Sequence, residues 1–166
     1  MGESQACDLV GRIDRAMIRE ARLVAVEYTV FVHATEDFDK VIKAVENLMP
    51  PKLRERKKVE FEETHGHYEN PIRIARVSFR NPEYASQAFA WIWARLSDED
   101  RARLMKDLDL HLDDKSKLYV RLDKQEAFLG HVRLSSSDDV IKVVFNFKGP
   151  REAARDFLLS HNSKAV

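Results

Sequence analysis

The sequence predicts an α+β fold in which helices cover one face of a mixed or antiparallel sheet. Residues 23–33 alternate apolar and polar side chains with a period of two, which is typical of a half-buried strand. Residues 38–49 repeat apolar side chains three and four positions apart, which is typical of an amphipathic helix. Two further strand patterns follow each other around Gly66 and predict an antiparallel hairpin. This order of elements favours α+β over a doubly wound parallel fold.

The first half of the chain predicts a helix, a strand and a second helix. Residues 9–20 carry apolar side chains at helical spacing, and the alternating strand over 23–33 follows them. Thr35 is the expected N-cap of the second helix. Pro50-Pro51 should end that helix, because proline has no backbone N–H to donate.

The hairpin joins predicted strands over 58–64 and 72–79. In its second strand the apolar parity changes between Ile74 and Val77. A change of parity within one strand predicts a β-bulge at that point.

The second half of the chain begins with two helices whose caps are visible in the sequence. Asn81 is the expected N-cap of the first, with proline next to it, and Ser97 is the expected N-cap of the second. Strands are predicted around 118–122 and over 140–147, and Pro150 opens a terminal helix. The chain should therefore divide into an N-terminal helical extension (1–22), a single α+β domain (23–148), and a C-terminal helix and tail (149–166).

Composition excludes several classes of protein. The chain of 166 residues has 28 basic and 28 acidic side chains, so any binding of nucleic acid must depend on where the charges lie. Cys7 is the only cysteine, which excludes an internal disulfide and a cysteine-based zinc site. No apolar run approaches the ~20 residues of a membrane helix. We expect a soluble cytoplasmic protein with no membrane contact.

Enzyme motifs are absent from the sequence. It has no GxSxG, P-loop or GxGxxG pattern, and its carboxylates fall mostly on amphipathic helices, where solvated faces explain them. We therefore expect no catalytic residues and no cofactor.

Basic side chains gather at positions that could bind phosphate groups. The densest run lies between the second helix and the hairpin, and others follow on the hairpin and beyond: Lys52, Arg54, Arg56, Lys57, Lys58, Arg73, Arg76, Lys124 and Arg133. If they converge on one face, that face would attract RNA through charge and counterion release. For the 52–58 run taken alone, an ordinary solvated loop is the alternative interpretation.

The turn at 64–71 is compact and polar. Tyr68 could stack on an unpaired base, and Asn70 could bind a base edge. His65 and His67 could belong to a metal site, but zinc needs three or four ligands and no HExxH motif is present. The structural alternative is that Asn70 and the following proline only fix the turn.

The stretch 121–130 places several polar side chains between a strand and a glycine. We expect Lys124 to contact phosphate and Gln125 to contact a base or sugar. Arg121 is a further candidate RNA-binding residue, and its structural alternative is an ion pair with Asp123 on the same strand face. Lys124 and Gln125 are expected to reach solvent, because they lie between two apolar patterns. In the structural alternative, Asp123 caps a short helix that follows it.

Trp91 and Trp93 lie two positions apart on one predicted helix, so they cannot both face the centre of the core. One of them could cover an exposed apolar patch that binds another protein. Packing at the edge of the core is the alternative.

Three phrases of the sequence together resemble an archaeal family of RNA-binding proteins, some of which are described as exosome subunits. They are Phe31-Val32-His33-Ala34-Thr35-Glu36-Asp37, Gly66-His67-Tyr68-Glu69-Asn70-Pro71-Ile72, and Arg121-Leu122-Asp123-Lys124-Gln125 with Phe128-Leu129-Gly130. The similarity extends from about Val24 to Phe147. It implies a fold like that of the ribosomal protein that binds 5S ribosomal RNA, and a homodimer.

The leading hypothesis from the sequence is a non-catalytic accessory protein that binds structured RNA, in RNA processing or ribosome-related steps, within an RNA-processing complex. The competing hypothesis is a module that docks on a larger RNA machine without touching RNA. A metal-dependent hydrolase using His65 and His67 ranks third. Convergence of the basic run with Arg73, Arg121 and Lys124 would favour the first hypothesis.

Overall fold

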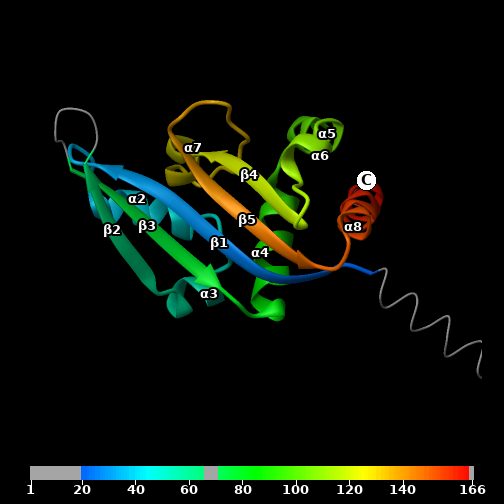
Figure 1. Ribbon diagram of the computed structural model, residues 1–166. Coiled ribbons are helices and arrows are strands. Elements are labelled where there is room, and N and C mark those ends of the chain that lie inside the picture. Colours follow the sequence, from blue (N-terminus) through cyan, green and yellow to red (C-terminus); the bar gives the residue numbers. More distant parts are fainter. Residues whose placement is uncertain (1–19, 66–70, 165–166) are drawn as a thin grey trace, which may run out of the picture.

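The computed structural model describes residues 20–65 and 71–164, and five strands in these ranges form one sheet in the order β2-β3-β1-β5-β4 (Figure 1). Neighbouring strands are antiparallel throughout. The strands are β1 (Arg22–His33), β2 (Val59–His65), β3 (Pro71–Phe79), β4 (Lys117–Asp123) and β5 (Val140–Lys148). The predicted α+β class is confirmed, and the sheet is antiparallel rather than mixed.

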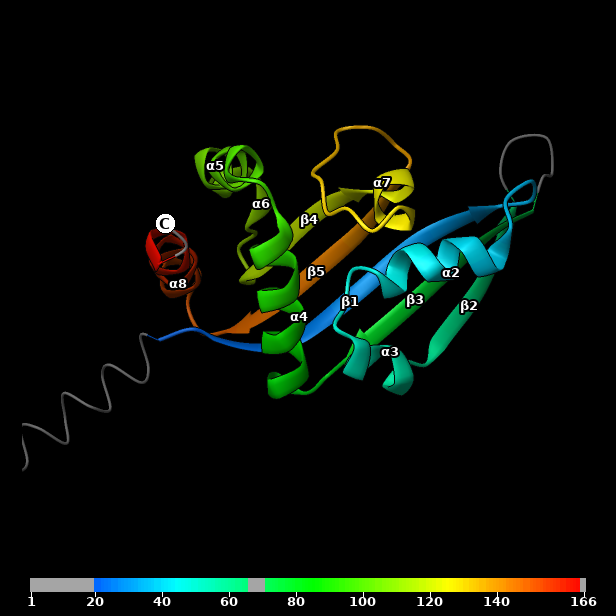
Figure 2. The same cartoon turned by 180° about the vertical axis from the view of Figure 1, so that it is seen from behind.

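Helices cover one face of this sheet, and α6 (Leu108–His111) lies at the edge of β4 (Figure 2). The helices are α2 (Phe38–Glu46), α3 (Pro51–Arg56), α4 (Pro82–Arg95), α5 (Asp98–Lys106), α6 (Leu108–His111), α7 (Lys124–Phe128) and α8 (Arg151–Lys164). Figure 2 shows α2, α3 and α4 in front of the strands, and Figure 1 shows the same strands from the opposite side, in front of those helices. We call the uncovered side of the sheet the open face.

The core lies between the strands and the helices. On β1, Val26, Tyr28, Val30 and Val32 point toward the helices and are buried. The Tyr28 hydroxyl donates to the Leu48 carbonyl at 3.0 Å, just after the end of α2. Burial raises the pKa of Tyr28, so the phenol stays neutral and keeps this hydrogen bond, which joins the central strand to the helix layer.

Two of the three predicted helix starts are confirmed. Asn81 Oδ1 accepts a hydrogen bond from the Glu83 N–H at 2.9 Å, and the Ser97 Oγ accepts one from the Asp100 N–H at 3.0 Å. Thr35 is not the cap of α2, because Asp37 accepts the hydrogen bond from the backbone instead.

The prediction that the proline pair ends α2 is wrong. The helix itself stops at Glu46, ahead of both prolines. Pro51 then occupies the first turn of α3, where the missing N–H would have had no helical partner.

The bulge expected between Ile74 and Val77 is absent. β3 pairs with β1 in unbroken register from Ile72 to Phe79, and the register shifts instead between Leu23 and Ala25 of β1. The parity change in β3 arises because Ile74 is an apolar residue on the open face, not because an extra residue is inserted.

The C-terminal helix belongs to the same core. Ala154 and Leu158 are buried, and the Phe157 ring lies 5.4 Å from the Phe147 ring. The helix expected over 9–20 lies outside the described residues except for its last position, and the division into 1–22, 23–148 and 149–166 stays a prediction. Within 20–65 and 71–164, no helix is long and apolar enough to cross a membrane.

The Tyr28 hydrogen bond can be tested by Tyr28→Phe. The variant should lower the free energy of unfolding by about 1–3 kcal/mol, because the Leu48 carbonyl keeps no hydrogen-bond partner in an apolar core. Urea denaturation followed by circular dichroism measures this. Tyr84→Phe is the control, since Tyr84 is only partly buried, and it should change stability by less than about 0.5 kcal/mol. Equal effects would contradict the assignment.

Candidate nucleic-acid interface

Antiparallel pairing places three basic side chains in one line across the open face. Thr29 of β1 is opposite Arg76 of β3 on one side and Lys142 of β5 on the other, and Lys142 is opposite Arg121 of β4. Residues directly opposite each other share a face of a sheet. Three strand spacings separate Arg76 from Arg121, a span of about 14 Å. We call Arg76, Lys142 and Arg121 the cation row.

Apolar and aromatic side chains flank the cation row on the same face. On one side Phe31 is opposite Ile74, and Phe31 is 47% exposed although it lies on the central strand. On the other side Tyr119 is opposite Val144. The open face therefore carries cations in its middle and apolar side chains beside them, with the carboxylates of Glu27, Glu60 and Glu62 toward its β2 side.

The face is hollowed where these groups meet. A cavity of about 620 Å³ is lined by residues of four strands, of α6 and of the segment before β5. The lining residues are Thr29, Phe31, Ile74, Arg76, Leu110, His111, Tyr119, Arg121, Asp138, Val140 and Lys142. Three permanent cations thus face one carboxylate in a partly apolar hollow.

Two of the three cations have no carboxylate partner among the described residues. Arg76 pairs with Glu62 at 2.9 Å and lies 4.0 Å from Glu27. The Arg121 guanidinium donates to the Ser137 carbonyl at 3.2 Å, and the Lys142 ammonium lies over the Tyr119 ring, 5.3 Å from its centre. Their charge is therefore available to an anionic ligand.

Tyr119 is held in place by Asp113. Its hydroxyl donates to Asp113 Oδ2 at 3.2 Å. Partial burial and this carboxylate raise the pKa of Tyr119, so the phenol stays neutral. For Asp113, partial burial raises the pKa, but hydrogen bonds from the Lys117 and Lys115 N–H groups and from Tyr119 outweigh it and lower the pKa. The hydrogen bond to Asp113 therefore holds the Tyr119 ring in place next to the cation row.

The basic run at 52–58 does not join this face. Its residues lie in α3 and just after it, on the helix side of the sheet (Figure 2). Arg54 Nε donates to the Glu46 carbonyl at 2.8 Å and to the Met49 carbonyl at 3.0 Å, and Lys57 pairs with Glu46 at 2.9 Å. Arg54 and Lys57 therefore stabilise the end of α2.

The remaining members of the run are exposed. Lys52 and Arg56 both lie over the Tyr84 ring, at 6.0 Å and 5.4 Å, and Lys58 is exposed. Arg73 also faces the helix side, at the far end of β3, where it lies 3.8 Å from Glu63. The convergence of the run with Arg73 and Arg121 that would favour RNA binding is not observed.

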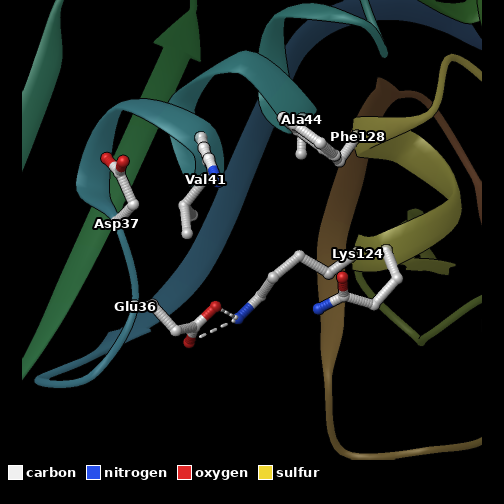
Figure 3. A pocket seen from close by; sticks show the side chains of 8 residues that line it. Glu36, Asp37, Val41, Ala44, Lys124 and Phe128 are labelled. Carbon is white, nitrogen blue, oxygen red and sulfur yellow. Dashed lines mark hydrogen bonds and ion pairs between the residues drawn. The ribbon is translucent and has the colours of Figure 1, made fainter.

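The prediction that Lys124 reaches solvent is wrong. Lys124 is 3% exposed, and its ammonium lies 2.8 Å from Asp139, 3.1 Å from Glu36 and 2.9 Å from the Phe31 carbonyl. Figure 3 shows it pointing from α7 toward Glu36, at the edge of α2. The ammonium has no donor left for a phosphate, because three acceptors from three separate segments already bind it.

The neighbouring polar residues Asp123, Gln125 and Arg133 have different surroundings. Asp123 is the N-cap of α7 and accepts from the Glu126 N–H at 2.9 Å, as the structural alternative predicts. Gln125 is exposed and donates to Asp139 at 3.3 Å. Arg133 is exposed, lies 3.6 Å from Glu126, and lines a different hollow from the cation row. Contacts of Gln125 and Arg133 with RNA stay predictions.

The predicted site at the hairpin turn lies outside the described residues, which include neither Tyr68, Asn70 nor His67. Within the ranges 20–65 and 71–164, no group of three His, Cys, Asp or Glu side chains is arranged to hold a metal ion. The expectation of no bound transition metal stays a prediction.

The tryptophan patch that would favour a protein-docking module is not formed. Trp93 is buried, stacked 5.4 Å from the Phe89 ring. Trp91 is half-buried, donates to the Asn47 carbonyl at 3.1 Å, and is covered by Arg95. Both indoles therefore serve packing.

Comparison with known proteins identifies the family. A family model described as RNA binding matches residues 25–147. The chain belongs to this RNA-binding family. An uncharacterized protein of Methanocaldococcus jannaschii is 41% identical over 129 residues, which cover 76% of this chain and 85% of that protein. An RNA-binding protein of Pyrococcus abyssi is 38% identical over 120 residues, 71% of this chain and 77% of its own length.

Solved structures share the fold. A protein of Archaeoglobus fulgidus superposes with a TM-score of 0.73 at 26% identity, covering 84% of this chain and 99% of its own. A protein of Sulfolobus solfataricus gives 0.72 at 26% identity, covering 86% and 99%. The archaeal RNA-binding family predicted from the sequence is confirmed, whereas exosome membership and the likeness to the 5S RNA-binding ribosomal protein stay predictions.

Sequence reasoning missed Phe31, His111, Tyr119 and Lys142 in this member of the RNA-binding family. A signal for three of them was present, because Phe31, Tyr119 and Lys142 occupy the outward positions of strands whose inward positions are uniformly apolar. His111 carries no such signal, because it reaches the hollow only through the folding of α6 against the edge of β4.

Replacing the buried lysine should affect folding. Lys124→Met keeps the length of the side chain but leaves Glu36 and Asp139 without their cation, so the free energy of unfolding should fall by about 1–3 kcal/mol. The two carboxylates keep access to water, which limits the loss. Gln125→Ala, the exposed neighbour, should change stability by less than about 0.5 kcal/mol. A Lys124 variant that melts like the parent would contradict the buried cluster.

The same pair predicts a dependence on pH. Partial burial raises the pKa of Asp139, but the hydrogen bonds from Lys124 and Gln125 and the charge of Lys124 outweigh it and lower the pKa. A carboxyl with a lowered folded pKa stabilises the fold above its unfolded value of about 3.9 and loses that effect as pH falls through the folded value. The stability difference between parent and Lys124→Met should therefore be complete near about pH 6 and shrink below about pH 4.

Thermal unfolding measured across this range of pH tests the dependence. If the difference in stability between parent and Lys124→Met stays constant from neutral to strongly acidic solution, Lys124 does not lower the pKa of Asp139. Asp139→Asn should reduce the pH dependence of the difference and leave the contact between Lys124 and Glu36 in place.

Proposed function

We propose that this protein is a non-catalytic RNA-binding accessory protein that binds RNA on the open face of its sheet, through the cation row. Its place in RNA processing or ribosome-related steps, within a larger complex and as a homodimer, follows from the family resemblance as part of the same proposal. The observation that carries the RNA site is the line of Arg76, Lys142 and Arg121 across an uncovered sheet.

Charge placement supports this face over the helix side. The protein has zero formal net charge, so a distant polyanion gains little from the field of the whole molecule. Binding must come from short-range contacts with cations whose charge the protein does not neutralise. Arg121 and Lys142 have no carboxylate partner among the described residues, and Arg121 donates to one carbonyl. By contrast, Arg54 donates to two carbonyls, and Lys57 and Lys124 pair with carboxylates.

Membership of the RNA-binding family supports the same proposal from a separate direction. The matched residues 25–147 include all of the cation row and all of the lining of the hollow. The relative from Pyrococcus abyssi bears the name RNA-binding protein. The shared part of the chain is therefore the part that builds the open face.

The proposal predicts that RNA affinity falls steeply with salt concentration and that substitution of the cation row makes this fall less steep. Arg76→Gln/Arg121→Gln/Lys142→Gln should weaken binding of a fluorescent RNA that contains both a stem and unpaired tails. The slope of log K against log salt should flatten by roughly 0.7–0.9 for each phosphate that the variant no longer neutralises, about 2 in all. Fluorescence anisotropy over a series of salt concentrations measures the slope.

A charge-matched variant on the other face is the control. Lys43→Gln/Lys52→Gln/Arg56→Gln removes the same three charges from the exposed surface of α2 and α3, including two members of the basic run. It should keep the parent slope. If the control flattens the slope and the open-face variant does not, the RNA site lies on the helix side and the proposal is wrong.

A further inference from the structure

We infer that the open face binds unpaired RNA, with a base against Tyr119 and the adjoining phosphates on Lys142 and Arg121. The inference rests on the proposed function and specifies its ligand. A base would contact the apolar part of the hollow, for which binding of phosphate alone gives no role. Figure 1 looks onto this face, where the strands lie in front of the helices.

The apolar surface beside the cation row argues against a duplex. An A-form helix offers proteins mainly its phosphates and 2′-hydroxyl groups, and its base faces are covered by stacking. A duplex on this sheet would leave Phe31, Ile74 and Leu110 facing polar backbone. Phe31 is 47% exposed and Leu110 is 83% exposed, so both offer surface that a flat, unstacked base could cover.

Tyr119 is the side chain best placed to take a base. Its ring is half-buried on the open face and its hydroxyl is anchored to Asp113, so the ring needs little ordering when a ligand binds. The Lys142 ammonium lies over the ring, 5.3 Å from its centre, so a base that stacks on that face moves this flexible side chain aside toward the phosphate, and Arg121 is opposite Lys142 on the next strand. A nucleotide whose base lies against Tyr119 therefore has its phosphate within reach of two cations.

The dimensions of the hollow fit a base that leaves the stack. Its volume of about 620 Å³ exceeds what ions or waters need, and it spans both the apolar side and the cation row. Aromatic side chains on an exposed sheet, next to a basic groove, are a general solution for binding single strands, because every base offers a π-face. Sequence preference should accordingly be weak.

An acidic protein segment is the competing ligand for a face with this charge. Such a segment would use the cation row but would gain no stacking energy from the Tyr119 ring beside it. The role of the Tyr119 ring therefore separates the two ligands.

The experiment compares three probes on the full chain by fluorescence anisotropy: a short unpaired RNA, the same RNA annealed to its complement, and a polyglutamate peptide of equal charge. The unpaired RNA should bind at least about tenfold more tightly than either other probe, since stacking contributes about 1–3 kcal/mol for each base. Duplex or peptide binding as tight as that of the unpaired RNA would overturn the inference.

Variants of the ring then test the base contact. Tyr119→Ala should weaken binding of the unpaired RNA by about 5- to 150-fold, the same stacking range expressed as a ratio, and leave duplex binding unchanged. Tyr119→Phe keeps the ring and should stay close to the parent. Equal losses in the Ala and Phe variants would mean that the hydroxyl bond to Asp113, not stacking, is what matters, and would overturn the inference.

A second aromatic residue, Phe31, provides an independent test in case Tyr119→Ala does not fold. Phe31→Ala removes an exposed ring from the open face and should weaken unpaired RNA binding, whereas Phe61→Ala removes an exposed ring that packs on Phe38 at the helix side and should not. If the cation-row variant loses all RNA binding but both Phe variants and Tyr119→Ala bind like the parent, the proposed function stands and this inference fails. If no RNA of either kind binds the parent, both fail.

Discussion

One-sided burial of the central strand is the constraint on which the rest of the structure depends. β1 pairs with β3 and β5, so both of its hydrogen-bonding edges are occupied, and the helices cover only one of its faces. Antiparallel sheets accept this arrangement because alternate side chains can face water. The open face is therefore free to carry Thr29 and Phe31 on β1, with the cation row formed by its neighbours. Helices on that side would have buried Arg121 and Lys142, which have no carboxylate partner among the described residues.

The buried lysine keeps the edge of this face in place. Lys124 binds the Phe31 carbonyl, Glu36 and Asp139 at once, and so joins the end of β1 to the start of α7 and to the segment that leads into β5. That segment contains Ser137, the partner of Arg121, and Asp138, which lines the hollow. A buried ammonium is tolerated only where several acceptors surround it. Its action on any ligand is therefore indirect, through the rim that it positions.

Much of the fold could be predicted from the sequence, because one-sided burial makes apolar residues recur every two positions in a strand and every three to four positions in a helix. Buried and less buried residues alternate from Val26 onward in β1, throughout β4 and from Ile141 onward in β5, and residue type alone predicts the caps Asn81 and Ser97. The candidate site was harder to predict from the sequence, for a physical reason. A basic side chain looks the same in a sequence whether it has no hydrogen-bond acceptor among the described residues, as at Lys142, or is bound by several acceptors, as at Lys124 and Arg54. Only the tertiary partners distinguish these cases, and they come from positions up to 93 residues away.

The parity change in β3 shows how an irregular structural signal can mark function. Ile74 breaks the alternation of its strand, and a bulge would have explained it locally. The unbroken register instead places Ile74 opposite Phe31, on a face that water covers. An apolar pair outside the core contributes less to folding than a core pair does, because neither residue is fully buried. Such a pair is useful if it remains uncovered until a ligand with both a flat apolar surface and a negative charge arrives. A nucleotide has both, so the local anomaly in the sequence and the cation row point to the same kind of ligand.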